Sequence, residues 1–197
     1  MIAFFAAVLL SLHSPARADG PGIVCVPARE GYRLVRESDG VVFGKPLSRA
    51  ECGLSVAAAA DGVVCARADI SGDKSWKAVS VAHGHWLGRY AVPAEDCFEA
   101  TRHARGGVVC GHTGLVLDGG KLGWKPTFTA KPDDKGFLGS SAWLDFCKVA
   151  TLHAREGQAC ANGNGGTGDH RYWYRQWIAT AGLVDGARPG TVFECSK

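Results

Sequence analysis

The sequence lacks the features that mark several large classes of protein. Its 22 Lys and Arg residues are nearly balanced by 19 Asp and Glu residues, and the formal net charge of +3 gives no reason to expect nucleic acid as a partner. Beyond the N-terminus no apolar run approaches the roughly 20 residues that cross a bilayer. No Cys-x2-Cys pair of the kind that holds structural zinc is present. We therefore expect no membrane span and no nucleic-acid partner.

Motifs for catalysis are also missing. The chain has no Gly-x-Ser-x-Gly segment, and no spacing of its carboxylates predicts the pair that glycoside hydrolysis needs. Residues 163–168 fit Gly-x-Gly-x-x-Gly, but the next segment is typical of a strand, whereas a dinucleotide site needs a helix there. We expect no cofactor, and the sequence favours a protein that is not an enzyme while leaving that question open.

The N-terminus has the layout of a secretory signal peptide. Residues 2–12 form an apolar run interrupted only by Ser11, which is too short to span a bilayer. Pro15 and an Ala-x-Ala cleavage pattern at residues 16–18 follow. We predict a signal peptide at residues 1–18 and a single secreted or periplasmic domain at residues 19–197.

The chain contains eight cysteines, and none of them lies in the predicted signal peptide. An even number of cysteines in an exported chain predicts a disulfide framework. The cysteines are Cys25, Cys52, Cys65, Cys97, Cys110, Cys147, Cys160 and Cys195.

An internal repeat is the most informative pattern in the sequence. Twelve residues separate the two cysteines in each of the segments 52–65, 97–110 and 147–160, which align without gaps. An apolar residue followed by glycine precedes each segment, at Gly44, Gly88 and Gly139. The pattern predicts four pseudo-repeats of about 45 residues. Their approximate bounds are 22–62, 63–107, 108–157 and 158–197, and the last is truncated.

Each unit is predicted to contain short strands followed by one helix, which gives an α+β fold whose units share one core. Ser48 and Glu51 form a capping box that starts the first helix. Gly62, Gly106 and Gly157 are predicted to end the helices in a left-handed conformation. The arrangement resembles cysteine-containing repeats of exported bacterial proteins, which implies a place in a bacterial envelope but assigns no functional residue.

Two disulfide patterns respect this repeat. In the first, each helix cysteine bonds the next strand cysteine, which gives 52–65, 97–110, 147–160 and 25–195. In the second, each unit is closed internally, which gives 25–52, 65–97, 110–147 and 160–195. The constant twelve-residue spacing slightly favours the first pattern, because a helix and a returning strand would bring the paired cysteines to one level.

Aromatic residues in the last unit are the strongest candidates for binding. On a strand, Tyr172 and Tyr174 face one way while Trp173 and Trp177 face the other. We predict a binding surface for an extracellular glycan or protein, because exposed aromatic rings beside polar groups give large contact areas. The predicted residues are Tyr172, Trp173, Tyr174, Arg175, Trp177 and Trp86. The alternative is that both faces of this strand are buried.

His83 and His85 are weak candidates for metal ligands. A His-x-His pair on a strand places both rings on one face, but a third ligand is needed, and His112 or a carboxylate would have to supply it. The sequence does not bring these residues together.

The sequence favours a secreted binding or interaction module, for cell-wall glycan or for a protein partner. One alternative is an extracellular hydrolase with its site in the loops around His83, His85 and residues 163–170. Another is a protein inhibitor with a protruding loop at residues 162–171, or an envelope structural protein. The oligomeric state, the ligand and the disulfide pairing remain open at this point.

Overall fold

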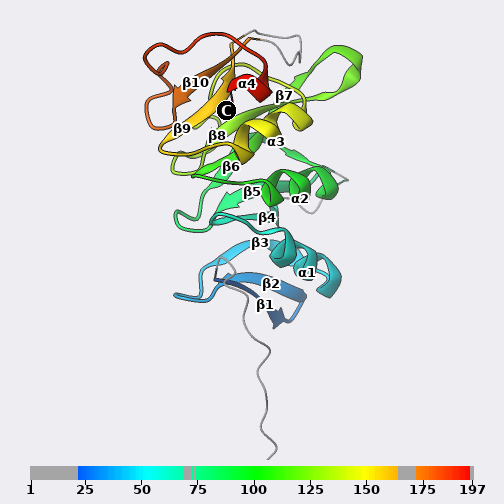
Figure 1. Ribbon diagram of the computed structural model, residues 1–197. Coiled ribbons are helices and arrows are strands. Elements are labelled where there is room, and N and C mark those ends of the chain that lie inside the picture. Colours follow the sequence, from blue (N-terminus) through cyan, green and yellow to red (C-terminus); the bar gives the residue numbers. More distant parts are fainter. Residues whose placement is uncertain (1–21, 69–71, 73, 164–171, 196–197) are drawn as a thin grey trace, which may run out of the picture.

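The computed structural model describes residues 22–68, 72, 74–163 and 172–195. The predicted signal peptide at residues 1–18 and residues 164–171 of the glycine-rich loop lie outside these ranges. The described chain has an α+β fold with small antiparallel sheets, three helices of nine or ten residues and a final helix of four residues (Figure 1). None of the helices in these ranges is long and apolar enough to cross a bilayer.

Each sheet is followed by a helix. The first sheet holds β1 (Ile23–Ala28), β2 (Gly31–Arg36) and β3 (Val42–Leu47), and α1 (Arg49–Ala58) follows. The second holds β4 (Val63–Arg67), β5 (Trp76–Ser80) and β6 (Trp86–Val92), before α2 (Ala94–Arg102). The third holds β7 (Val108–Val116) and β8 (Leu122–Phe128), joined through the short helix η1 (Asp118–Gly120), before α3 (Leu144–Leu152). The fourth holds β9 (Gln158–Asn162) and β10 (Trp173–Trp177), before α4 (Val192–Cys195).

The start of α1 is confirmed and the predicted helix ends are wrong. The Ser48 hydroxyl accepts the Glu51 N–H at 3.2 Å, and the Glu51 carboxylate accepts the Ser48 N–H at 2.7 Å. The end of α1 is instead capped by Ala59. Gly62 follows Asp61 in a tight turn in which both residues have positive φ, as a type I′ hairpin turn requires. The glycine therefore redirects the chain into β4 rather than capping the helix.

The disulfides follow the internal pattern, so the pattern favoured by the twelve-residue spacing is wrong. Each bond joins the first strand of a sheet to the helix that follows the same sheet, and the paired Cα atoms lie 5.9 Å apart. The bonds are Cys25–Cys52, Cys65–Cys97, Cys110–Cys147 and Cys160–Cys195.

The direction of the chain after each helix explains this pairing. Cys52 lies in the first half of α1 and faces the sheet that precedes the helix, with its Sγ 3.9 Å from the Arg33 carbonyl oxygen on β2. Cys65 comes after the turn at Asp61 and Gly62 and therefore belongs to the next sheet. A helix and a returning strand can bring two cysteines to the same level, but the cysteines stay apart when the strand enters a different sheet.

The sheets are stacked along the molecule, with β1 at one end and β10 near the other (Figure 1). Glycines allow the close approach between neighbours. A Cβ atom on Gly44 would lie 2.6 Å from the Arg67 carbonyl oxygen of β4, and one on Gly88 would lie 2.9 Å from the His112 nitrogen of β7. Apolar side chains from adjacent sheets share their cores, so each sheet covers the next.

We expect removal of the Cys65–Cys97 disulfide to destabilise the protein more than removal of the Cys25–Cys52 disulfide. The chain segments closed by Cys65–Cys97 and Cys25–Cys52 are similar in length, with separations of 32 and 27 residues. The double substitution C65A/C97A should lower the free energy of unfolding by about 3–5 kcal/mol, and C25A/C52A by about 2–4 kcal/mol. The difference arises because Cys65 is fully buried whereas Cys25 is partly exposed. Urea denaturation measures both values, and an equal or reversed order would contradict the packing described.

Candidate functional site

Strand β10 carries most of the predicted binding residues, and its pairing with β9 fixes their directions. Arg175 lies opposite Cys160, and Trp177 lies opposite Gln158. Trp173, Arg175 and Trp177 therefore share one face of the strand. This face runs from the core to the solvent, because Trp173 is 0% exposed whereas Trp177 is 42% exposed.

The structure buries some of the predicted binding residues of the last unit and exposes others. Trp173 packs in a core cluster with Cys160, Val192 and Cys195, so it is removed from the residues that a ligand can touch. Tyr172 is exposed next to the strand, and Tyr174 is half-buried against Gly163. These positions leave Arg175 and Trp177 as the accessible side chains on their face.

Trp86 does not join this surface. It lies on β6 in the second sheet, where it is half-buried beside the first core cluster. The Lys77 ammonium group lies 5.9 Å from the centroid of its ring. The structure therefore separates Trp86 from the aromatic residues of β10, which sequence spacing alone could not reveal.

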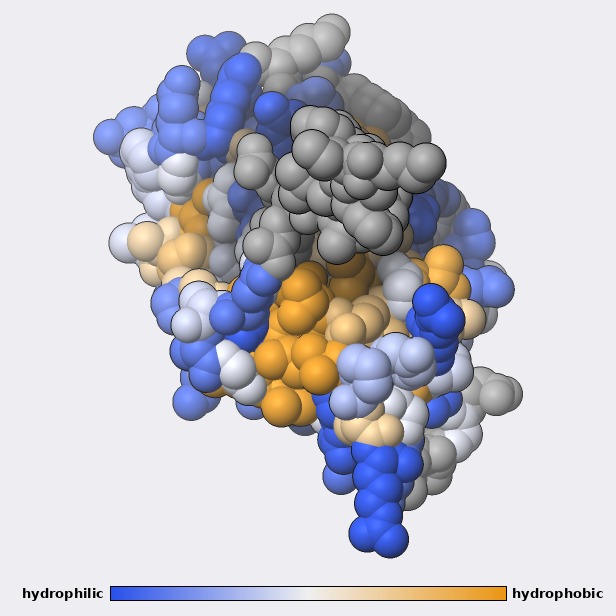
Figure 2. Space-filling view, turned by 90° about the horizontal axis from the view of Figure 1, so that it is seen from below, coloured by the Kyte–Doolittle hydropathy of each residue, from blue (hydrophilic) through white to orange (hydrophobic). Residues whose placement is uncertain are grey.

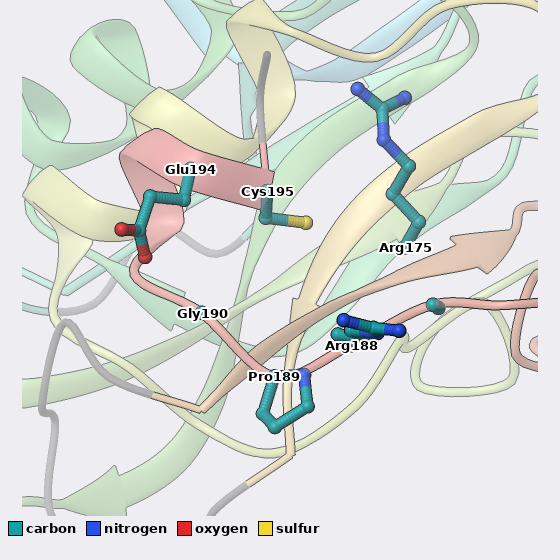
Figure 3. A pocket seen from close by; sticks show the side chains of 7 residues that line it. Arg175, Arg188, Pro189, Gly190, Glu194 and Cys195 are labelled. Carbon is teal, nitrogen blue, oxygen red and sulfur yellow. The ribbon is translucent and has the colours of Figure 1, made fainter.

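A concavity of about 500 Å³ opens on the Arg175 side of β10 (Figure 3). The chain after β10 returns to pair Gly190 with Trp173, through backbone hydrogen bonds of 2.8 and 3.1 Å, and then forms α4. This return places a second arginine at the concavity. The lining residues are Arg175, Ala187, Arg188, Pro189, Gly190, Glu194 and Cys195.

The charges of this concavity are not balanced internally. Glu194 caps α4, because its carboxylate accepts the Thr191 N–H at 2.7 Å while the Thr191 hydroxyl accepts the Glu194 N–H at 3.1 Å. Figure 3 shows that carboxylate on the opposite side of Cys195 from Arg175. Among the described residues no carboxylate forms an ion pair with Arg175 or Arg188. The concavity therefore presents two guanidinium groups that no described carboxylate neutralises.

Arg188 was not identified from the sequence. Its only signal is the Arg-Pro-Gly segment at residues 188–190, where a proline and a glycine mark a turn after a strand. That signal indicates a change of direction but not which side chains the turn brings to β10.

The helix side of the molecule carries a concavity of the opposite charge. It measures about 600 Å³ and lies between α1 and α2, where carboxylates surround Leu54 and Phe98. The carboxylates are Glu51, Glu95, Asp96 and Glu99, accompanied by Arg102. Burial, helped by the charge of Glu95, raises the pKa of Asp96, while Lys74 opposes the shift. Glu51 and Glu99 already form ion pairs with Arg67 at 3.3 Å and with Lys148 at 3.0 Å, so the negative charge of this concavity is partly compensated.

His83 and His85 lie together, and the described residues place no third metal ligand beside them. Their rings stack with centroids 5.4 Å apart, and the His85 Nε2–H donates to the Thr129 carbonyl oxygen at 3.1 Å. In the described ranges no group of three or more His, Cys, Asp or Glu side chains is placed to hold a metal ion. Residues 164–171, the other part of the predicted hydrolase site, lie outside the described residues.

Comparisons with protein-family models, with curated proteins and with solved structures found no match for this chain. The functional argument therefore depends on the geometry of the residues themselves.

His112 is a buried titratable group in the core rather than at either concavity. It lies between Tyr90 and Trp124, and neither ring nitrogen forms a hydrogen bond within the described part of the chain. It lines a small space of about 10 Å³, which is at the lower limit for one water molecule. Burial, with the charge of Lys74 as a second cause, lowers the pKa of His112, and the backbone of Tyr90 opposes the shift.

We expect this histidine to make the fold less stable in mild acid. Because its pKa is lower in the folded state, the unfolded chain takes up the proton first as the pH falls below the ordinary value of about 6.5. The free energy of unfolding should therefore fall between pH 7.5 and pH 5, as measured by urea denaturation. The variant H112F should lose less stability over this range, and H83F, changed at an exposed site, should match the wild type. Equal losses in H112F and the wild type would contradict this role.

Proposed function

We propose that this protein is a secreted or periplasmic binding module whose ligand site is the concavity beside β10. The four disulfides and small domain are compatible with an extracellular module. The observation that carries the proposal is that Arg175 and Arg188, which pair with no described carboxylate, line one concavity, while the exposed Trp177 lies on the same face of β10 as Arg175. Residues 1–18 act as the export signal in this proposal.

The chemistry of these residues points to a ligand with both an anionic group and a flat apolar face. Guanidinium groups bind carboxylates in a bidentate manner. An exposed indole ring stacks on the face of a sugar and adds contact area at low entropic cost. A carboxylate-bearing glycan of the cell wall combines both features, and we propose this class as the ligand. A protein partner would have to present an acidic side chain at the same place.

Binding is a better match to this concavity than hydrolysis. Glycoside hydrolysis uses two carboxyl groups, one to protonate the leaving group and one to act as base or nucleophile. The carboxylate at this site, Glu194, already accepts the Thr191 N–H as part of the α4 cap. The hydrolase alternative therefore gains no support from the residues around Arg175.

We further propose that the chain is one domain of four pseudo-repeats, with bounds near residues 22–62, 63–107, 108–157 and 158–197. The recurring order of sheet and helix and the recurring strand-to-helix disulfide support this view. In this view the β10 concavity lies on the face of the fourth sheet that corresponds to the faces the earlier sheets turn toward the next sheet.

The ligand proposal predicts a specific loss of affinity. Titration calorimetry with carboxylate-bearing oligosaccharides should show saturable binding, weakened about 10-fold or more in R175Q and in R188Q, since hydrogen bonds to charged groups contribute about 1.5–3 kcal/mol. W177A should weaken binding as well, because it removes the stacking surface. R29Q, which changes an exposed arginine in the turn between β1 and β2, is the matched control and should bind like the wild type.

The probe itself supplies a second control. The same oligosaccharides with their carboxyl groups reduced should bind much more weakly. Equal binding of both forms, or an equal loss in R29Q and R175Q, would show that the guanidinium pair does not recognise the ligand.

A further inference from the structure

Each of the later sheets has one face that is buried against the sheet before it. In β4 this face includes Val64 and Ala66, which pack with Leu34 and Phe43 of the first sheet. In β7 it includes Val109, which packs with Leu87 of the second sheet. In β9 the same face includes Ala159 and Ala161, both buried in one cluster with Leu138. These small and β-branched side chains are the contact surface between sheets.

Within the described ranges, no other element packs on the corresponding face of the first sheet. The register pairs Val24 with Val35 and Val35 with Val42, so these valines form one row across the sheet, and Val26 shares their face. We call Val24, Val26, Val35 and Val42 the valine face. Val26 is 41% exposed and Val42 is 51% exposed, whereas Ala66 and Ala161, which follow their strand cysteines as Val26 follows Cys25, are fully buried.

This end of the molecule carries an apolar patch. Figure 2 views the structure from the β1 end and shows an apolar patch bordered by polar residues. Arg33 lies opposite Val26 on the same side of the sheet and is half-buried. Its long apolar stem can cover neighbouring valines while its guanidinium group reaches water.

The opposite end of the stack does not complement this face. In the first three sheets the face turned toward the next sheet is apolar, as in Ile23, Leu34 and Phe43. In the fourth sheet Arg175 takes the place of Leu34, because it lies opposite Cys160 as Leu34 lies opposite Cys25. Gln158 takes the place of Ile23, two residues before the strand cysteine. A head-to-tail contact between two molecules would place these polar groups on the valines without partners, which is unfavourable.

We propose that the valine face binds the valine face of a second copy of this chain. The interface continues, between two molecules, the kind of sheet-on-sheet packing that the chain already uses within itself. Flat rows of valine are self-complementary, and contact between identical faces has two-fold symmetry and closes at a dimer. The polar C-terminal end then stays free in both copies, so the dimer carries two β10 concavities at its outer ends.

This proposal does not depend on the ligand assigned to β10, because it uses different residues at the other end of the stack. Its test is the oligomeric state of the exported protein with all four disulfides formed. Sedimentation velocity over a concentration series up to about 1 mM should show a monomer converting to a dimer, without larger species. A wild type that remains monomeric throughout, or that forms longer assemblies, would overturn the proposal.

Point variants locate the interface. V42D places a carboxylate on the valine face, and because two-fold symmetry buries it twice, we expect dimerisation to weaken on the order of 100-fold. V26D, on β1 at the other side of β2, should act similarly, and V42I should still form the dimer. V116D is the matched control, since Val116 is 67% exposed on β7 and lies outside the valine face. A V42D protein with a normal melting curve that dimerises as tightly as V116D would place the contact elsewhere and overturn the proposal.

Discussion

The structure depends on one recurring constraint, the disulfide that ties the first strand of each sheet to the helix that follows it. A sheet of two or three short strands is marginally stable by itself. The bond holds a helix against such a sheet and buries the cysteines at the contact, as Cys65 and Cys97 show. Once helix and sheet are joined, the sheet offers a fixed apolar face on which the next sheet packs. The core of the chain is therefore assembled from neighbouring pairs rather than around one centre.

This mode of assembly leaves two ends that differ in chemistry. At the β10 end Arg175 stands where earlier sheets have apolar residues, and the returning chain adds Arg188. At the β1 end Val26 and Val42 are exposed, and Ala66 and Ala161, the counterparts of Val26, are buried. A charged open face suits a soluble ligand, whereas an apolar one suits another protein surface. The two proposed activities therefore follow from the composition of the faces that stacking leaves uncovered.

Much of the local structure could be predicted from the sequence, because it depends on neighbours in the chain. The Ser48–Glu51 capping box, the opening strands and the alternation along β10 all followed from spacing. The disulfide pairing did not, because it depends on which sheet the chain enters after Gly62. Burial of Trp173 depends on α4, and the position of Arg188 depends on pairing between Gly190 and Trp173. These are tertiary contacts without a local signal.

The most direct test of this account is a map of the disulfides in the native protein. Digestion without reduction, followed by mass spectrometry, identifies which cysteine-containing peptides are joined. The structure predicts that the peptide with Cys65 is linked to the one with Cys97, and the peptide with Cys110 to the one with Cys147. Linkage of Cys52 to Cys65, or of Cys97 to Cys110, would contradict the joining of each helix to its own sheet and, with it, the stacking that defines both ends.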